Sequence, residues 1–391
     1  MRNPLADKVV GIQPSGIRKF FDIASEMKDA ISLGVGEPDF DTPWQIREEG
    51  IYSLERGKTH YTANSGLIEL REEISRYLKR QYNLTYDAKK EILVTVGGSE
   101  AIDLAFRAML NPGEEVIIPE PCYVSYLPCA VLADAVPVTI RLQEKNNFCL
   151  TPEELEAAIT GKTKILVLAF PNNPTGAVMN REQLEKIAEV CIRHDIFVVS
   201  DEIYSALNYG EERHVSIAEL PGMWERTIVI NGFSKAHAMT GWRLGYACGP
   251  NLILQQMIKI HQFAIMCAPT TSQQAAVVAL RDCDDEVAKM REEYNERRRF
   301  MLAKLRGMGL KVFEPLGAFY IFPNISEFGL TSDEFATRFL REKHVAAVPG
   351  TAFGTCGEGF LRMSYATSLK NLKIAMERLE EFVTELRAER A

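Results

Sequence analysis

Short apolar runs alternate with stretches of helical spacing through the middle of the chain, between residues 91 and 249. The runs are rich in β-branched side chains and are bounded by turn residues, as buried strands are. We predict strands at residues 92–96, 115–118, 136–140, 165–170, 196–200, 227–230 and 244–248. Because strands that alternate with helices form parallel sheets covered on both faces, the pattern predicts an α/β fold with a mostly parallel seven-stranded sheet flanked by helices.

The pattern changes after residue 282. A long, charged, amphipathic helix is predicted at residues 285–308, and a second helix with apolar positions from 372 to 386 closes the chain. Between them we predict short strands at residues 318–322, 345–348 and 360–364. This region is typical of a smaller α+β domain, which the long helix joins to the sheet.

Two helix starts inside the sheet region are marked by capping boxes. Thr151 is followed three residues later by Glu154, and Asn180 is followed by Gln183. In both pairs the first side chain can accept from the backbone of the second residue, and the second can reach back to the first. Helices are therefore expected to begin directly after Thr151 and Asn180.

The length of 391 residues is too great for one small core and fits two domains. We place a large domain at residues 46–282 and a small domain at residues 1–45 together with 283–391. A hydrophobic share of 46% and a charged share of 25% are those of an ordinary globular protein.

Composition excludes several functions. The net charge of -8 argues against nucleic-acid binding, which needs a basic face. The chain has no apolar run long enough to span a bilayer and no signal-peptide pattern at its start, so we expect a cytoplasmic protein without a membrane partner. The eight cysteines are scattered, without a CxxC pair or histidines at ligand spacing, so no metal site is expected.

The first candidate for chemistry is Lys235, which follows the predicted strand at residues 227–230. Ligands bind at the carboxyl edge of open α/β sheets, and an amine placed there can be desolvated enough to react as a nucleophile. A single lysine is more often a solvated surface charge, so its neighbours decide the interpretation.

Other polar residues also follow predicted strands. In VTVGGSEA a strand runs through two glycines into a helix, the order that a phosphate site requires, so the amides of residues 98–100 are expected to face an anion. Asn173 stands in PNNPTG, and SDEIY supplies Asp201 and Tyr204. A carboxylate at the end of a buried strand needs a cation or proton donor as its partner.

Together with Ser234 and Arg243, these stretches supply an anion site, a carboxylate, an amide, a phenol and an amine at one sheet edge. A cofactor with a phosphate, a protonatable ring nitrogen, a phenolic oxygen and an aldehyde uses every one of these groups. Pyridoxal phosphate is such a cofactor.

A family resemblance supports this interpretation. The segments SLGVGEPDF, HYTANSG, VTVGGSEA, PNNPTG, SDEIY, SKAHAMTGWRLGY and FLRMSYA follow one another in the order found in class I aminotransferases. The chain resembles this family of fold-type I pyridoxal phosphate enzymes, and in particular the subgroup with bacterial and archaeal aromatic and aspartate aminotransferases. The resemblance spans nearly the whole chain.

The resemblance implies a role for each matching residue. Lys235 is expected to bind the cofactor covalently and to move protons, Asp201 to pair with the ring nitrogen, and Tyr204 and Asn173 to hydrogen-bond the ring oxygen. The implied catalytic residues are Lys235, Asp201 and Tyr204. The implied cofactor-binding residues are these three with Gly98, Ser99, Glu100, Tyr123, Asn173, Ser234, Arg243 and Tyr61.

The resemblance also implies how substrate binds. Arg362 matches the arginine that grips the substrate α-carboxylate with a bidentate fork, and Gly36 offers backbone nearby. Asn173, Tyr123 and Ile17 complete the implied substrate pocket, and the segment at residues 15–18 resembles a part of the small domain that closes over substrate.

Tyr61 matches a tyrosine that reaches the phosphate of the other subunit. The implied assembly is therefore a homodimer with shared active sites.

The function that follows is transfer of an α-amino group from an L-amino acid to a 2-oxo acid such as 2-oxoglutarate or pyruvate, with ping-pong kinetics. Relatives that prefer acidic substrates can carry a lysine after the double glycine, where this chain has Ser99. Aromatic or aliphatic donors are therefore favoured over aspartate, and an acylated diaminopimelate is a further candidate.

Two alternatives use the same residues. The first is β-elimination that cleaves a carbon–sulfur bond on the same scaffold, although NPTGAV and MTGWRLGY look more like the transaminating branch. The second is a regulator that binds the cofactor without turnover. Such proteins usually carry an added DNA-binding segment, which is not expected here.

Overall fold

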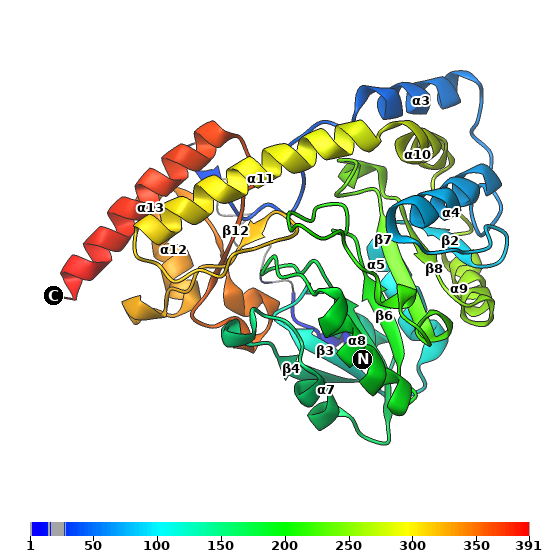
Figure 1. Ribbon diagram of the computed structural model, residues 1–391, viewed down its shortest axis with the longest axis horizontal. Helices are drawn as coiled ribbons and strands as arrows, with labels where there is room; N and C mark the ends of the chain where they lie inside the picture. The colour runs from blue at the N-terminus through cyan, green and yellow to red at the C-terminus, as the bar shows by residue number, and fades with distance from the viewer. Residues whose placement is uncertain (1, 15, 17–26, 28, 391) are drawn as a thin grey trace.

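The computed structural model describes residues 2–14, 16, 27 and 29–390, and its largest element is a seven-stranded sheet (Figure 1). The strand order is β2-β8-β7-β6-β5-β3-β4. The strands are β2 (Ile92–Thr95), β3 (Glu115–Glu120), β4 (Val136–Arg141), β5 (Thr163–Ala169), β6 (Phe197–Asp201), β7 (Thr227–Gly232) and β8 (Gly245–Cys248). Neighbouring strands run parallel except at β8, which is antiparallel to β2 and β7. The predicted mostly parallel sheet is confirmed.

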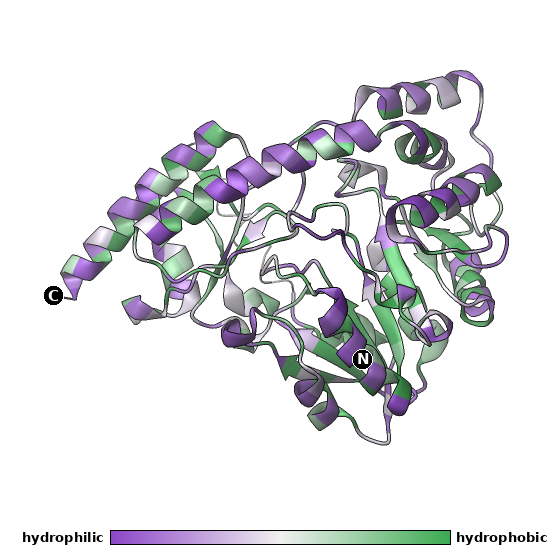
Figure 2. Ribbon diagram, in the orientation of Figure 1, coloured by the Kyte–Doolittle hydropathy of each residue, from purple (hydrophilic) through white to green (hydrophobic). Residues whose placement is uncertain are grey.

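Helices cover both faces of this sheet, which explains why its inner strands are mostly apolar and buried. In β7, Ile228 and Ile230 pack with α5 (Gly98–Met109), while Val229 packs on the other face with α4 (Ile68–Tyr82). The first face is also covered by α6 (Tyr126–Leu132) and α9 (Asn251–Ala264), and the second by α7 (Pro152–Ala158), α8 (Arg181–Arg193) and α10 (Thr270–Asp282). Figure 2 shows the hydrophobic colour concentrated on the strands and the hydrophilic colour on the outer helices.

A second, smaller group of elements packs beside the sheet. Its strands form the antiparallel order β11-β12-β9 and a parallel pair of β1 with β10. Its elements are β1 (Ile31–Ser32), α11 (Asp284–Gly307), β9 (Tyr320–Ile321), α12 (Ser332–Lys343), β10 (Val345–Ala346), β11 (Val348–Pro349), β12 (Leu361–Ser364) and α13 (Leu369–Glu389). In Figure 1, α11 runs from the helices beside the sheet to α13, as the sequence predicts for a joining helix.

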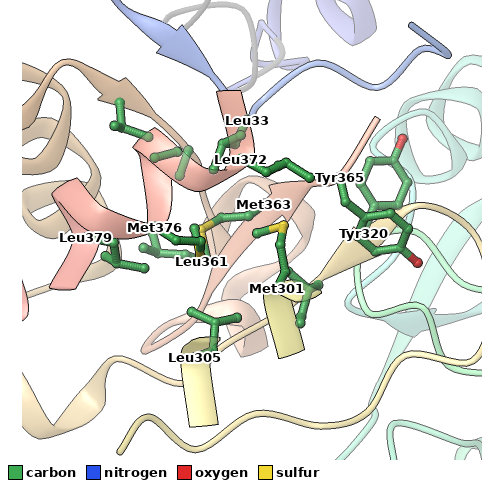
Figure 3. Packing of buried hydrophobic residues seen from close by; sticks show 14 of the residues in the cluster. Leu33, Met301, Leu305, Tyr320, Leu361, Met363, Tyr365, Leu372, Met376 and Leu379 are labelled. Carbon is green, nitrogen blue, oxygen red and sulfur yellow. The ribbon is translucent and has the colours of Figure 1, made fainter. Parts of the chain in front are cut away.

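The hydrophobic core of this smaller group is formed by side chains from distant parts of the chain. Leu33 follows β1 and packs with Met301 of α11, Met363 of β12 and Leu372 of α13 (Figure 3). All four side chains are inaccessible to solvent. The segment around residues 31–36 is thereby held against the C-terminal region.

One predicted strand is wrong in detail. Residues 345–348 form two strands, because β10 pairs with β1 while β11 pairs with β12. The chain changes partner at Ala347, so a single apolar run belongs to two sheets. The division of the chain into domains at residues 46 and 282 stays a prediction.

Both predicted capping boxes are present, and α12 carries a third, between Thr331 and Glu334. The remaining elements are the helices α1 (Asp7–Val10) and α3 (Trp44–Glu55) and the 3₁₀ turns η1 (Glu144–Asn146), η2 (Ile217–Glu219), η3 (Trp224–Arg226), η4 (Thr240–Trp242), η5 (Ser326–Phe328), η6 (Gly350–Phe353) and η7 (Thr355–Gly357).

Within the residues that the structure describes, no helix combines the length and apolar character needed to cross a membrane. The same part of the chain contains no group of three or more histidine, cysteine, aspartate or glutamate side chains arranged to hold a metal ion.

The Asn180 capping box offers a test of the local fold. Asn180→Ala removes the side-chain acceptor of the Gln183 amide, so we expect the free energy of unfolding to fall by about 1 kcal/mol. Denaturant unfolding followed by circular dichroism measures the change. Glu189→Ala, on the exposed face of the same helix, is the control and should change the value by less than about 0.5 kcal/mol. Equal losses in the two variants would contradict the capping interpretation.

Candidate active site

A cavity of about 460 Å³ lies at the carboxyl ends of β5, β6 and β7, where the second group of elements meets the sheet. It is lined by Gly36, Glu37, Gly98, Ser99, Ile102, Tyr123, Tyr126, Ala169, Pro171, Asn173, Asp201, Ile203, Tyr204, Ser234, Lys235, Thr240, Gly241, Arg243, Tyr320 and Arg362. The structure thus brings most of the sequence-predicted site residues to one place, although they come from segments far apart in the chain.

Lys235 follows β7 and lies in the wall of the cavity. Its Nζ donates a hydrogen bond to the carbonyl oxygen of Gly36. Gly36 belongs to the segment around residues 31–36, which packs against the hydrophobic core of the smaller group of elements. Burial, together with the neighbouring cations of Arg362 and Arg243, lowers the pKa of Lys235 to about 8, against the opposing carboxylates of Glu37 and Asp201. A neutral amine is therefore accessible near physiological pH, as a nucleophile or a proton acceptor requires.

Asp201 is the last residue of β6 and is buried beneath the cavity. The Tyr126 hydroxyl donates to its Oδ2 at 2.8 Å, and the Ile203 amide donates to its Oδ1 at 3.2 Å. Burial raises the pKa of the Asp201 carboxyl, and these two hydrogen bonds act in the opposite direction. The donors fix the orientation of the carboxylate and leave it facing the cavity as a partner for a cationic ring nitrogen.

Arg362 is 2% exposed and comes from β12, in the second group of elements. Its Nη2 donates to Gly34 O at 2.6 Å, and its Nη1 donates to Asn173 Oδ1 at 3.1 Å. The guanidinium carbon also lies over the rings of Tyr320 and Phe353, at 4.4 Å and 4.7 Å from their centroids. Desolvation lowers its pKa from the ordinary arginine value.

The guanidinium of Arg362 has no carboxylate partner among the described residues, and its Nε is buried without a hydrogen-bond acceptor there. A buried cation that lacks an anionic partner is costly unless a ligand supplies one. The geometry fits a carboxylate that enters the cavity.

The opposite end of the cavity is formed by the start of α5. Gly97 has a positive φ of 79°, and no side chain of the described residues caps the helix, so the first amides of α5 stay open to a ligand. Gly98, Ser99, Ser234 and Arg243 line this end of the cavity. An uncapped helix start beside a guanidinium and a hydroxyl is suited to a phosphate.

The space around this turn leaves no room for side chains. An added Cβ on Gly97 would lie 2.7 Å from Nη2 of Arg243, and one on Gly245 would lie 2.7 Å from the backbone of Gly97 and Gly98. Gly245 is therefore required for the close packing of β8 against the start of α5, while Gly97 is favoured by its positive φ and by the nearby Arg243 side chain.

Glu100 is placed differently from the other predicted cofactor ligands. Its side chain does not belong to the cavity lining but turns back, where its carboxylate accepts from the Val96 amide and lies 2.7 Å from Nδ1 of His261. Only its backbone amide, in the first turn of α5, remains available to an anion.

Tyrosine side chains form the remaining walls of the cavity. Tyr123 lies with its hydroxyl 3.3 Å from Ser99 Oγ and packs edge-on against Tyr126. The Tyr204 hydroxyl is 2.9 Å from the Tyr320 hydroxyl, and burial raises the pKa of both phenols above the ordinary tyrosine value.

Sequence reasoning missed Tyr126, Tyr320 and Glu37 as site residues. Tyr126 stands in the same PCYVSY segment as Tyr123, which was a usable signal. Tyr320 lies in an apolar run and looks like an ordinary core residue. Only its contacts with Arg362 and Tyr204 show that it belongs to the site.

Besides Glu100, two further sequence-predicted residues are not part of the cavity as described. Tyr61 is 82% exposed and lies outside the cavity lining of the single chain. Ile17 falls outside the described residues.

The donor set fits pyridoxal phosphate. The uncapped helix start and Arg243 suit its phosphate, the buried Asp201 carboxylate suits its ring nitrogen, and Lys235 suits its aldehyde. The buried guanidinium of Arg362 is left for a substrate carboxylate.

Comparison with known proteins identifies the class. Residues 28–379 match the family model described as aminotransferase class I and II, so the chain belongs to this family. It is a pyridoxal phosphate-dependent aminotransferase of fold type I, as the sequence predicts.

The relatives cover nearly the whole chain. The aspartate aminotransferase of Pyrococcus abyssi is 48% identical over 97% of this chain and 98% of its own length. The aromatic-amino-acid aminotransferase 2 of Thermococcus litoralis is 44% identical over 97% and 98%. The crystal structure of the aromatic aminotransferase from Pyrococcus horikoshii OT3 superposes with a TM-score of 0.90 at 45% identity, covering 95% of this chain and 99% of that one.

The lowered pKa of Lys235 makes a testable prediction. In the cofactor-free protein, the rate of reaction with added pyridoxal phosphate should rise with pH around a midpoint near 8, because only the neutral amine attacks the aldehyde. Arg362→Met removes the neighbouring cation that lowers the pKa of Lys235 more than Arg243 does, so it should raise this midpoint. Arg387→Met should leave the midpoint unchanged, because Arg387 pairs with Glu327 away from the cavity. Stopped-flow absorbance over pH 6 to 11 measures it. A midpoint above about 10, the value of an ordinary lysine, would contradict the prediction.

Proposed function

We propose that this aminotransferase moves the α-amino group of an aromatic or aliphatic L-amino acid to a 2-oxo acid such as 2-oxoglutarate or pyruvate. The two substrates would react in turn at the same site, which gives ping-pong kinetics. The observation that carries the proposal is that one cavity holds both a lysine of lowered pKa and a buried arginine with no carboxylate partner among the described residues. An amino acid bound through its carboxylate by Arg362 would present its Cα region to Lys235.

Each residue has a proposed task. Pyridoxal phosphate, when bound, supplies an aldehyde that carries the amino group and a ring that accepts electron density. Lys235 Nζ accepts a proton from the substrate Cα and returns one, since a pKa lowered to about 8 leaves part of the amine neutral near neutral pH. Asp201, oriented by Tyr126, stabilises positive charge on the ring side of the cavity. Tyr204 and Asn173 offer a hydroxyl and an amide to the ring oxygen.

Arg362 binds the substrate carboxylate with the orientation that Gly34, Asn173 and Tyr320 impose on it. Two aromatic rings lie against its guanidinium and two oxygen atoms accept its hydrogen bonds, so its orientation is fixed before substrate binds. A fixed fork of this kind positions the reacting carbon for proton transfer without a further loss of side-chain entropy.

The proposed substrate preference rests on the cavity walls. Ser99, which follows the glycine turn, carries no cation for a side-chain carboxylate, and Tyr123, Tyr320 and Ile102 present aromatic and apolar surface. The relatives include enzymes named for aspartate and for aromatic amino acids, and these walls support the aromatic or aliphatic choice.

A panel of amino donors with 2-oxoglutarate and with pyruvate tests the proposal. Phenylalanine, tyrosine, leucine and methionine should exceed aspartate in kcat/KM. Arg362→Leu should lower kcat/KM for every donor by about a hundredfold or more, because a charge-assisted bidentate contact is lost. Arg387→Leu is the matched control and should leave kcat/KM within about twofold, since it lies away from the cavity.

The same panel separates the alternatives. Release of pyruvate and ammonia from cysteine or cystathionine, without amino transfer to 2-oxo acids, would show carbon–sulfur elimination instead. Retention of a cofactor absorption band that depends on Lys235, with no turnover of any donor, would show a cofactor-binding regulator. A preference for aspartate would overturn the substrate assignment alone.

We further propose that the active assembly is a homodimer with shared active sites. Large apolar side chains stand exposed on neighbouring parts of the single chain, among them Tyr61 (82%), Phe263 (86%) and Met266 (44%). The loop around Tyr61 is tied to the connection between α9 and α10, because Asn64 donates to the Met266 carbonyl and Thr270, the first residue of α10, donates to the His60 carbonyl. Tyr61 is exposed to solvent in the single chain. In the dimer it would be covered by the partner and would reach the partner's phosphate site.

Mixing two inactive variants tests the shared site. Tyr61→Ala and Lys235→Ala chains, unfolded and refolded together, should form heterodimers in which one site has both residues intact. A random equal mixture should recover about a quarter of wild-type activity, since half of the dimers are mixed and each has one working site of two. A mixture of Lys235→Ala with Arg362→Leu is the control, because both residues act in their own chain. Equal recovery in the two mixtures, or none in the first, would contradict the role of Tyr61.

Two broader assignments stay proposals. Residues 46–282 would form the cofactor-binding domain, and residues 1–45 with 283–391 would close over the substrate, since Arg362 and Gly36 come from the second set and Lys235 from the first. We also propose that the enzyme acts in the cytoplasm on small-molecule substrates, without nucleic acid or membrane.

A further inference from the structure

One buried ionisable pair next to the cavity has no part in the proposed chemistry. His261, on α9, is inaccessible to solvent, and its Nδ1 lies 2.7 Å from Oε1 of Glu100 in the first turn of α5. The other carboxylate oxygen, Oε2, accepts from the Val96 amide. Because a carboxylate accepts and does not donate when ionised, Nδ1 of His261 carries the proton of the shared hydrogen bond.

The pair holds the turn that forms the phosphate end of the cavity. Val96 and Gly97 join β2 to α5, and the Glu100 carboxylate ties Val96, the first residue of this turn, to the helix. Thr95 fixes the same turn from the strand, because its Oγ1 donates to the Gly97 carbonyl at 2.9 Å. The open amides of α5 are thereby set in one direction, and Glu100 sets them without entering the cavity.

The charge of Glu100 makes its partner important. A carboxylate in the first turn of a helix stabilises that helix, but it also repels a phosphate bound at the same end. Among the described residues, the Glu100 carboxylate is bonded only to the Val96 amide and to His261. The hydrogen bond to His261 therefore holds the Glu100 carboxylate against α9, away from the cavity.

The position of His261 has a cost that points to a functional reason. Its second ring nitrogen, Nε2, is buried without a hydrogen-bond partner among the described residues. A buried polar atom left without a partner costs free energy, and an apolar side chain would fit better on this face of α9, where Leu254 and Met257 are its neighbours on the buried stripe.

We propose that Glu100 and His261 are positioning residues for the phosphate of the cofactor. The pair fixes the direction of the amides at the start of α5 and turns the carboxylate charge away from the phosphate, so it sets the affinity for the phosphate group and not for the pyridine ring. This inference rests on the proposed binding of the phosphate at the start of α5.

The experiment compares pyridoxal phosphate with pyridoxal, which has the same ring and aldehyde but no phosphate. Dissociation constants are measured by absorbance titration of the cofactor-free protein, and no turnover is needed. His261→Leu should weaken binding of pyridoxal phosphate about tenfold, the loss of one charge-assisted hydrogen bond, and change pyridoxal binding by less than about twofold. His261→Gln, which keeps a donor in a polar side chain, should lose about threefold for the phosphate ligand alone.

The double variant tests whether the charge of Glu100 weakens phosphate binding when His261 is absent. Glu100→Gln removes the charge and keeps an acceptor for the Val96 amide, so Glu100→Gln with His261→Leu should bind pyridoxal phosphate more tightly than His261→Leu alone. His194→Leu is the matched control, because His194 pairs with Glu156 in the same way at 2.6 Å on the surface, away from the cavity. It should change neither dissociation constant.

The outcomes separate this inference from the proposed function. Equal weakening of pyridoxal and pyridoxal phosphate would show a general structural role for the pair and would overturn the inference. A double variant that binds no better than His261→Leu would overturn the charge argument. Failure of wild-type protein to prefer pyridoxal phosphate over pyridoxal would instead remove the phosphate site itself, and with it the proposed function.

Discussion

The structure depends on keeping two basic side chains, Lys235 and Arg362, in one desolvated cavity. Their mutual repulsion and the loss of water both favour the neutral amine, so the pKa of Lys235 falls to about 8 while the guanidinium of Arg362 keeps its charge. Such an arrangement is unfavourable for a folded chain by itself. It persists because the surrounding elements hold Arg362 by carbonyl and amide oxygens and by two aromatic rings.

The two packed regions of the chain contribute different parts of this arrangement. The sheet delivers Asp201 and Lys235 at its carboxyl edge, where parallel strands end together. The smaller region delivers Arg362 from β12 and the carbonyl oxygens of Gly34 and Gly36 from the segment after β1. The Lys235 amine and the Arg362 guanidinium both donate hydrogen bonds to carbonyl oxygens of that segment. The packing of Leu33 therefore helps to position both side chains in the site.

The phosphate end of the cavity follows a different principle. There the backbone provides the binding groups, and side chains serve mainly to set their direction. Gly97 and Gly245 allow the turn to pack closely. Thr95 fixes the turn through the Gly97 carbonyl, and Glu100, which is bonded to His261, fixes it through the Val96 amide. A site built from amides is strong only when the helix that carries them cannot rotate, which explains why buried polar contacts gather at the start of α5.

The sequence by itself determined the sheet, because strands that are buried on both faces appear as short, continuous apolar runs. It also determined Lys235, Asp201, Asn173, Arg243 and Arg362 as candidates, since each stands beside a strand end or in a segment typical of the family. Only the tertiary structure decided that Tyr320 contacts Arg362, that the residues 345–348 belong to two sheets, and that Glu100 turns toward His261 instead of the cavity. These features join residues from different elements of the chain or depend on which way a side chain turns, and local spacing carries no record of either.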